Sequence, residues 1–275
     1  MLGYPIQEIV WLVVWIVAGG IVTGLLAGLF GIGGGGIIVP VLYEVFRVMH
    51  VGDDVRMQLC IGTSIAIIIP TTIRSYLAHN ARGAVIPDVV RVWAGPAIFG
   101  VLLGAALAGF APGWVFKVAF VAITLFIAFR TLFAQDRWRL GTDLPKGLLM
   151  RFYGFLIGVV SSLMGVSGGS VSNMILALYG KPIHNAVATS AGVGVPITIA
   201  GAIGYMAAGW AHMDALPPFS IGFVSFIGFV VMAPVASFMA SYGVRLAHWL
   251  PRRKLEIAFG LFLILVALRF VVSLL

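Results

Sequence analysis

The chain has 275 residues, of which 61% are hydrophobic and 9% are charged, with a mean hydropathy of +1.11. Soluble globular domains carry roughly 25% charged residues, so this composition excludes a soluble domain and predicts an integral membrane protein. The 17 basic and 9 acidic residues concentrate in short loops, where they orient helices, and this distribution argues against a nucleic-acid partner.

Ten hydrophobic segments follow one another along the chain, and each is predicted to be a helix. Two neighbouring segments, 148–164 and 168–180, are shorter than the about 20 residues that a complete membrane crossing needs. The glycine-flanked pair in each half is therefore either two spans or a hairpin that dips to mid-membrane. The ten segments are 7–30, 34–49, 58–78, 89–110, 114–134, 148–164, 168–180, 185–208, 217–241 and 254–274.

The sequence contains a duplication. Three blocks recur in the same order, at offsets of 134, 126 and 139 positions. We therefore predict two repeats, 1–134 and 147–275, joined by the polar connector 135–146 within a single transmembrane domain. The matching blocks are 24–36 with 158–170, 63–72 with 189–198, and 112–130 with 251–269.

The placement of Lys and Arg predicts how the chain crosses the membrane. These residues gather in the connector and its flanks, in 242–254 and in 74–91, whereas the connections 111–113 and 209–216 contain none. The positive-inside rule puts the first group in the cytoplasm, so both termini are expected outside the cytoplasmic membrane. Because five segments per half is an odd number, the second half must enter upside down. The sequence thus predicts an all-α membrane protein of two inverted repeats, with glycine-broken helices that meet near the bilayer midplane.

Glycines have two predicted roles in this chain. Those at helix-packing spacing, such as Gly24, Gly100 and Gly158, are expected to let helices approach closely. The stretches 31–36 and 165–170 differ, because a run of glycines cannot sustain a helix against its backbone entropy. Unwound backbone at membrane depth survives only inside protein or beside a watery cavity, where its N–H groups and the following helix start attract anions.

The candidate anion site combines these breaks with hydroxyl groups of the next segment in each half. Substrate is predicted near the bilayer midplane, held by backbone N–H groups and by Ser and Thr hydroxyls. Pro70, Pro196, Arg74 and His79 are candidates for a gate or for groups that support the site. The predicted substrate-binding residues are Gly33, Gly34, Gly35, Thr63, Ser64, Ser167, Gly168, Gly169, Ser170, Asn173, Thr189 and Ser190.

The distribution of charge agrees with an anionic substrate. No Asp or Glu lies in the middle third of any predicted segment, whereas a cation carrier or a proton relay would be expected to bury a carboxylate. Arg74, His79 and Lys117 are expected to extend toward the membrane interface. The sequence predicts neither a metal site nor a cofactor.

The chain resembles the sulfite exporter TauE/SafE anion permeases, also called the four-toluene sulfonate uptake permease family. The resemblance covers nearly the whole chain and rests on the 24–36 block, its echo at 158–170, and the Gly-Thr-Ser…Pro…Thr arrangement of both halves. It implies a multi-pass protein of the cytoplasmic membrane that moves sulfite, sulfoacetate, other sulfonates or thiosulfate. The function implied is secondary transport by alternating access, with export expected and import left open as an alternative. The exact anion, the coupling proton or ion and the oligomeric state are left open.

Two alternatives remain. A passive anion channel would share the pocket but lack coupling and alternating access. An intramembrane serine hydrolase would use Ser167, which lies in a G-x-S-x-G pattern, and would need a histidine base within hydrogen-bond reach. His184, His212 and His248 all fall at segment edges or in loops. We therefore predict that the protein is not an enzyme.

Overall fold

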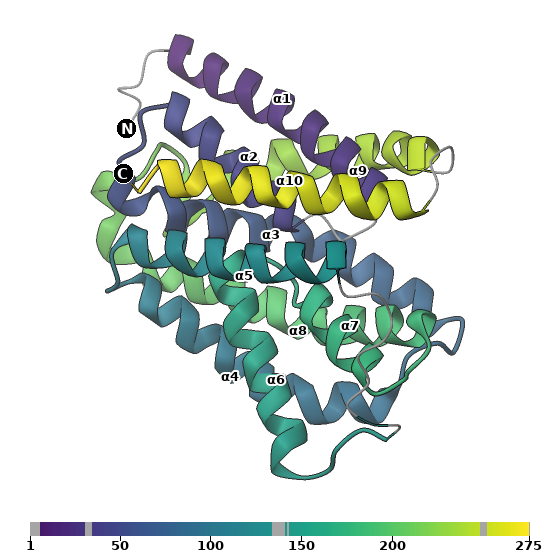
Figure 1. Cartoon of the computed structure of the whole chain (residues 1–275). Coiled ribbons are helices and arrows are strands. Elements are labelled where there is room, and N and C mark those ends of the chain that lie inside the picture. The colour runs from purple at the N-terminus through teal and green to yellow at the C-terminus, as the bar shows by residue number, and fades with distance from the viewer. Residues whose placement is uncertain (1–5, 31–34, 134–140, 142, 248–251, 275) are drawn as a thin grey trace.

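The computed structural model describes residues 6–30, 35–133, 141, 143–247 and 252–274, and these residues are almost entirely helical (Figure 1). The all-α membrane class predicted from hydropathy is confirmed. The first half contains α1 (Ile6–Phe30), α2 (Gly35–Val48), α3 (Asp53–Asn80), α4 (Pro87–Ala108) and α5 (Gly113–Phe133). The second half contains α6 (Leu148–Met164), α7 (Gly169–Leu178), α8 (Ile183–Ala208), α9 (Phe226–Ala247) and α10 (Arg252–Val272).

The largest error in the predicted boundaries is the start of α9, which begins at Phe226 and not at 217. The preceding residues form a 3₁₀ helix, η1 (Trp210–Ala215), and a short antiparallel hairpin of β1 (Ser220–Ile221) and β2 (Val224–Ser225). The hairpin turns at Gly222, whose φ of 53° no continuous helix could accommodate. A short apolar run such as 219–226 does not distinguish strand from helix by hydrophobicity alone.

Within the described residues, five helices are long and apolar enough to cross a membrane: α3, α4, α5, α8 and residues 253–272 of α10. Shorter apolar helical stretches lie at 13–26, 148–164, 169–178 and 226–239. Helix α7 has only 10 residues. It therefore extends roughly 15 Å, about half of the ~30 Å hydrocarbon core, and cannot complete a crossing alone.

Helices α3 and α8 form the centre of the bundle. In their most apolar windows 72% and 61% of the residues are buried, compared with 39% in α4 and 33% in α5. The two central helices pack against each other, α4 packs along α6, α1 along α9, and α5 along α10. The buried residues form separate clusters, one around α3 that includes Phe116 and another among α4, α6, α7 and α8 that includes Trp93. A site beside α3 and α8 therefore lies next to the most buried helices of the bundle.

The packing of α1 on α9 repeats the packing of α6 on α4. A Cβ atom on Gly24 would collide with the Ala236 carbonyl, and one on Gly158 would collide with the Ala97 carbonyl. The two glycines are 134 positions apart and the two alanines 139, which are offsets of the duplicated blocks. The close-packing role predicted for these glycines is confirmed. The division into repeats 1–134 and 147–275 and their inversion in the membrane remain predictions.

Candidate functional site

The helix break predicted in the second glycine block is present. Helix α6 ends at Met164, and α7 begins at Gly169. Between them Gly165 and Gly168 adopt left-handed φ angles of 69° and 76°, which L side chains rarely tolerate. Gly168 is also crowded, because an added Cβ would lie 2.7 Å from Ile157 Cγ2 and 2.7 Å from Ser161 Oγ. Glycine is thus required here for backbone conformation and for space.

In the first glycine block, α1 ends at Phe30 and α2 begins at Gly35. The predicted binding residues Gly33 and Gly34 lie outside the described residues, and Gly35 opens α2. At the next position, Gly36, an added Cβ would meet no atom of the described residues within 4 Å. With respect to those residues, Gly36 is uncrowded, unlike Gly168.

The structure brings Ser167, Gly169 and Ser190 together at the start of α7. A Cβ atom on Gly169 would lie 3.7 Å from Ser167 Oγ and 4.0 Å from Ser190 Oγ. Ser167 and the neighbouring Ser170 are half-buried. Ser190 is buried and donates its proton to the Val187 carbonyl of its own helix at 2.9 Å. The first N–H groups of a helix have no partner within that helix, so hydroxyls and free N–H groups are concentrated here.

Two polar atoms in the early part of α7 lack partners. Among the described residues, the buried Ser172 Oγ and Asn173 Oδ1 make no hydrogen bond. Ser172 has no exposed surface. A buried polar atom without a partner costs free energy, and such atoms in native proteins generally bind a ligand or an ordered water. The start of α7 is therefore suited to bind a polar ligand.

Ser64 connects the centre of α3 to the break in the other half. Its hydroxyl donates to the Gly165 carbonyl at 2.7 Å, a fully buried bond between residues 101 positions apart. The bond satisfies a carbonyl that α6 leaves free at its end. In this conformation the Ser64 proton is not available to an anion, and Ser64 acts on the site by holding its backbone.

The threonines of the two halves make equivalent bonds. Thr63 Oγ1 accepts the Ser225 N–H at 2.9 Å, and Thr189 Oγ1 accepts the Ile86 N–H at 3.0 Å. Ser225 directly precedes α9 and Ile86 directly precedes α4, so each threonine caps a helix of the opposite half. Ile86 and Ser225 are 139 positions apart, the offset of the third duplicated block. Each hydroxyl accepts these bonds through its oxygen and keeps its own proton to donate.

The predicted gate residues lie farther along the central helices. Pro70 and Pro196 are inside α3 and α8, as predicted, and Thr72 donates to the Ile68 carbonyl at 2.8 Å. Arg74 is exposed and follows Ser64 by ten residues, which is roughly 15 Å along the helix axis. His79, half-buried, is farther still. Thr72, two residues before Arg74, does lie near Ser167, because an added Cβ on Gly194 would be 2.9 Å from Thr72 Cγ2 and 3.1 Å from the Ser167 carbonyl oxygen. The role of Arg74 and His79 as a gate remains a prediction.

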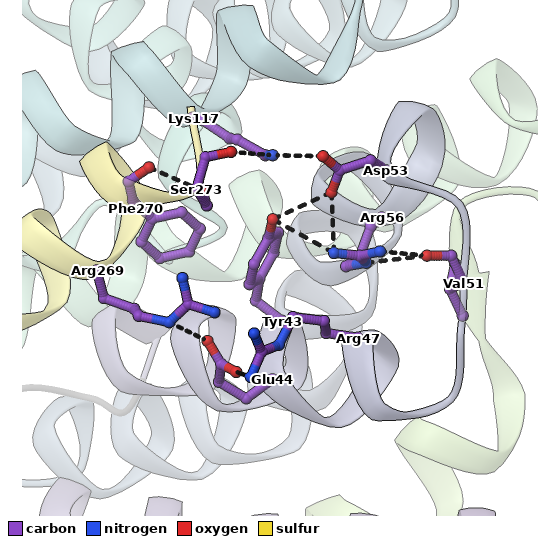
Figure 2. A network of polar contacts seen from close by, with 10 residues as sticks. All are labelled: Tyr43, Glu44, Arg47, Val51, Asp53, Arg56, Lys117, Arg269, Phe270 and Ser273. Carbon is purple, nitrogen blue, oxygen red and sulfur yellow. Dashed lines mark hydrogen bonds and ion pairs between the residues drawn. The ribbon is translucent and has the colours of Figure 1, made fainter. Parts of the chain in front are cut away.

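The sequence analysis missed a polar cluster where α2, α3, α5 and α10 meet (Figure 2). Asp53 lies 3.1 Å from Lys117 Nζ and 2.9 Å from Arg56, and it accepts the Tyr43 hydroxyl at 3.2 Å. The Lys117 side chain is 4% exposed, but its partner Asp53, the first residue of α3, is 57% exposed. Lys117 thus reaches an exposed counter-charge at a helix end, and its extension toward the membrane interface remains a prediction. We call Asp53, Arg56, Lys117 and Tyr43 the polar clasp.

An all-helical membrane protein whose halves repeat their contacts, and whose helix is broken beside buried hydroxyls, has the build of a secondary transporter. The chain belongs to the sulfite exporter TauE/SafE family, whose model matches residues 16–270. It is accordingly a transmembrane transporter of that family.

Similar proteins occur in bacteria and archaea. A probable membrane transporter protein of Haemophilus influenzae is 29% identical over 241 residues, which cover 88% of this chain and 91% of that protein. A probable membrane transporter protein of Methanocaldococcus jannaschii is 26% identical over 251 residues, covering 86% and 90%. The probable membrane transporter protein YunE of Bacillus subtilis is 28% identical over 218 residues, covering 69% and 78%. None of these descriptions names a catalytic activity.

Proposed function

We propose that the protein is a secondary transporter that exports small sulfur-containing anions, such as sulfite or sulfoacetate, across the cytoplasmic membrane. The break between α6 and α7 carries the proposal. It places free N–H groups of α7 beside the hydroxyls of Ser167 and Ser190, within a helix that also holds the unpartnered Ser172 Oγ. The family description supplies the class of anion.

The chemistry of this arrangement suits an oxyanion that must be released again. Helix N-termini carry partial positive charge, and hydrogen bonds from N–H and O–H groups replace the water that the anion loses. A full counter-charge at the same place would hold the anion more tightly. The two arginines of α3 are Arg56, which is paired with Asp53, and Arg74, whose side chain is exposed. We place the substrate near the midplane, between 35–36 with Thr63 and 165–173 with Ser190.

The central pair α3 and α8 supports alternating access. Each carries a threonine that caps a helix of the opposite half and a serine beside that threonine. An anion bound at the break therefore lies beside Ser64 and Ser190, and the adjacent threonines hold the starts of α9 and α4. If one half rocks against the other, the two threonine caps would move together. In this proposal both chain termini lie outside the cytoplasmic membrane.

Transport by the purified protein in proteoliposomes tests the proposal. Uptake and counterflow of sulfite, sulfoacetate, taurine and sulfate would be measured under imposed pH and voltage gradients. A carrier should saturate and should be stimulated by substrate on the opposite side, and the dependence on each gradient identifies the coupling ion. A linear flux without trans-stimulation would instead support a passive anion channel. Absence of flux for every sulfur anion would refute the proposed substrate class.

A further inference from the structure

A cavity of about 370 Å³ lies on the outside of the bundle between α1, α2 and α10. Its walls are apolar nearly throughout, and among the described residues Glu44 and Arg269 are the charged side chains that border it. We call it the α1–α2–α10 groove. Side chains that line it include Trp15, Val22 and Leu26 of α1, Val41 and Val48 of α2, and Leu265 of α10.

The polar end of the groove has a net positive charge. Glu44 is placed between two arginines, with Arg269 Nε 3.0 Å from one carboxylate oxygen and an Arg47 nitrogen 2.9 Å from the other (Figure 2). Two guanidinium groups share a single carboxylate. The excess of one unit charge makes this end attractive to an anion.

The two charged groups of Figure 2 differ in how accessible they are. In the polar clasp the cations are covered, with the Lys117 side chain 4% and the Arg56 side chain 12% exposed, while their shared Asp53 is 57% exposed. Arg269 lines the groove and is 34% exposed, and Arg47, which contacts Glu44 of the groove, is 51% exposed. The cations of the clasp are therefore engaged between helices, whereas these two arginines can still contact a molecule outside the protein.

The groove has its charged end near the ends of helices and its apolar wall along them, which matches the headgroup and acyl chain of a membrane lipid. Arg269 lies three residues before the end of α10, and Arg47 one residue before the end of α2, so both are within roughly 5 Å of a helix end. The start of α1 and the end of α10 lie at the same end of the molecule (Figure 1). From Trp15 the α1 wall runs eleven residues inward to Leu26, about 16 Å and close to half of the hydrocarbon thickness.

We propose that the groove binds one acyl chain of an anionic phospholipid, whose phosphate contacts Arg47 and Arg269. Every membrane lipid offers an acyl chain, so burial of the chain alone cannot select one. Selection rests on the headgroup, because the excess positive charge favours a lipid with net negative charge over a zwitterionic one. The site is separate from the transported anion, since it faces the outside of α1, α2 and α10.

Lipid binding to the purified full-length protein tests the inference. Phosphatidylglycerol and phosphatidylcholine with identical acyl chains would be titrated, with bound lipid measured by native mass spectrometry and unfolding temperature measured in parallel. Both lipids present a phosphate to the arginines, but the choline cation of phosphatidylcholine is repelled by the excess positive charge, so we expect about a tenfold preference for phosphatidylglycerol. Inorganic phosphate, added alone, should not reproduce the stabilisation.

Variants separate the headgroup from the acyl chain. Arg269→Gln should lower the affinity for phosphatidylglycerol about tenfold, whereas Glu44→Gln, which releases both arginines, should maintain or raise it. Arg91→Gln is the control, because Arg91 is a highly exposed arginine of α4. Ala18→Trp, which fills the groove, should weaken the binding of both lipids. Val14→Trp on the same helix should leave the binding of both lipids unchanged.

Four results would overturn the inference. Equal affinity for the two lipids would remove the role of the charge, and a loss of binding in Glu44→Gln would contradict the excess-charge argument. Equal stabilisation by inorganic phosphate would define an ion site in place of a lipid site. A change from dimer to monomer in Ala18→Trp, with lipid binding unaltered, would show that the groove receives a second copy of the chain.

Discussion

The two halves of the protein make the same bond through their threonines but different bonds through the adjacent serines. Thr63 and Thr189 each accept the N–H group just before a helix of the opposite half. Ser64 donates to the Gly165 carbonyl across the bundle, whereas Ser190 donates to Val187 in its own helix. Equivalent positions thus share the contacts that hold helices together and differ in the contacts that border the break.

This difference indicates a division of work between the halves. In the second half the break carries hydroxyls at Ser167 and Ser170. Their counterparts at the offset of 134 positions are glycines, of which Gly36 is uncrowded with respect to the described residues. The second half supplies side-chain donors to the proposed site, while α3 of the first half supplies the bond that fixes the backbone of that break. The predictions below test this division.

The largest expected effect is that of a side chain at Gly168. Gly168→Val should abolish transport, because a β-branched residue at φ 76° is strained by about 1–3 kcal/mol and its Cβ would lie 2.7 Å from Ile157 and Ser161 atoms. Uptake in proteoliposomes, together with the amount of protein recovered in the membrane, measures the effect. The first-half change Gly36→Ser introduces the residue type of its counterpart, Ser170, and should be tolerated because no atom of the described residues lies within 4 Å of an added Cβ. Loss of transport in Gly36→Ser would show that the start of α2 is packed as tightly as the break at Gly168.

The serines should differ in the property that they affect. Ser190 donates to Val187 of its own helix, a local bond that its hydroxyl can exchange for one to the anion, unlike the cross-bundle bond of Ser64. Ser190→Ala should therefore reduce the affinity for sulfite or sulfoacetate about ten- to a hundredfold with folding largely kept, since a lost bond to a charged group is worth roughly 1.5–3 kcal/mol. Ser167→Ala should behave in the same way. Ser64→Ala should mainly lower the unfolding temperature, because it removes the bond to Gly165. Equilibrium binding and thermal unfolding in detergent separate the outcomes, and unchanged affinity in both Ser167→Ala and Ser190→Ala would exclude these hydroxyls from the site.

The threonine caps should be equal in the two halves. Thr63→Val and Thr189→Val preserve shape but leave a buried N–H group without its acceptor, which costs about 1–3 kcal/mol. Each variant should lower stability by a similar amount, measured by thermal unfolding, and Thr63→Ser and Thr189→Ser should restore most of it. If only one of the two valine variants is destabilised, the caps are not equivalent and the duplication does not extend to the helix starts.

Features that depend on neighbouring residues could be predicted from the sequence, whereas contacts between distant positions could not. Helices and the break at Gly165–Gly168 depend on local hydropathy and backbone entropy, and both were predicted. The Thr63–Ser225 bond joins residues 162 positions apart, and the Lys117–Asp53 bond joins residues 64 apart. Nothing in a single sequence pairs such positions. Once one threonine cap is known, however, the block offsets predict the other, and this signal was present in the sequence.

The smallest expected effect concerns Asp88, which lies in the first turn of α4, whereas α9 has no acidic residue in its first turn. Asp88 complements the partial positive charge of the helix start, and its ion pair with Arg91 is 3.8 Å long and highly exposed. Asp88→Asn should therefore cost at most about 0.5 kcal/mol. Arg91→Gln should cost less, because it removes only the exposed pair. A larger loss from Asp88→Asn than from Thr189→Val would mean that the start of α4 is held chiefly by charge, and that the two halves secure their helices in different ways.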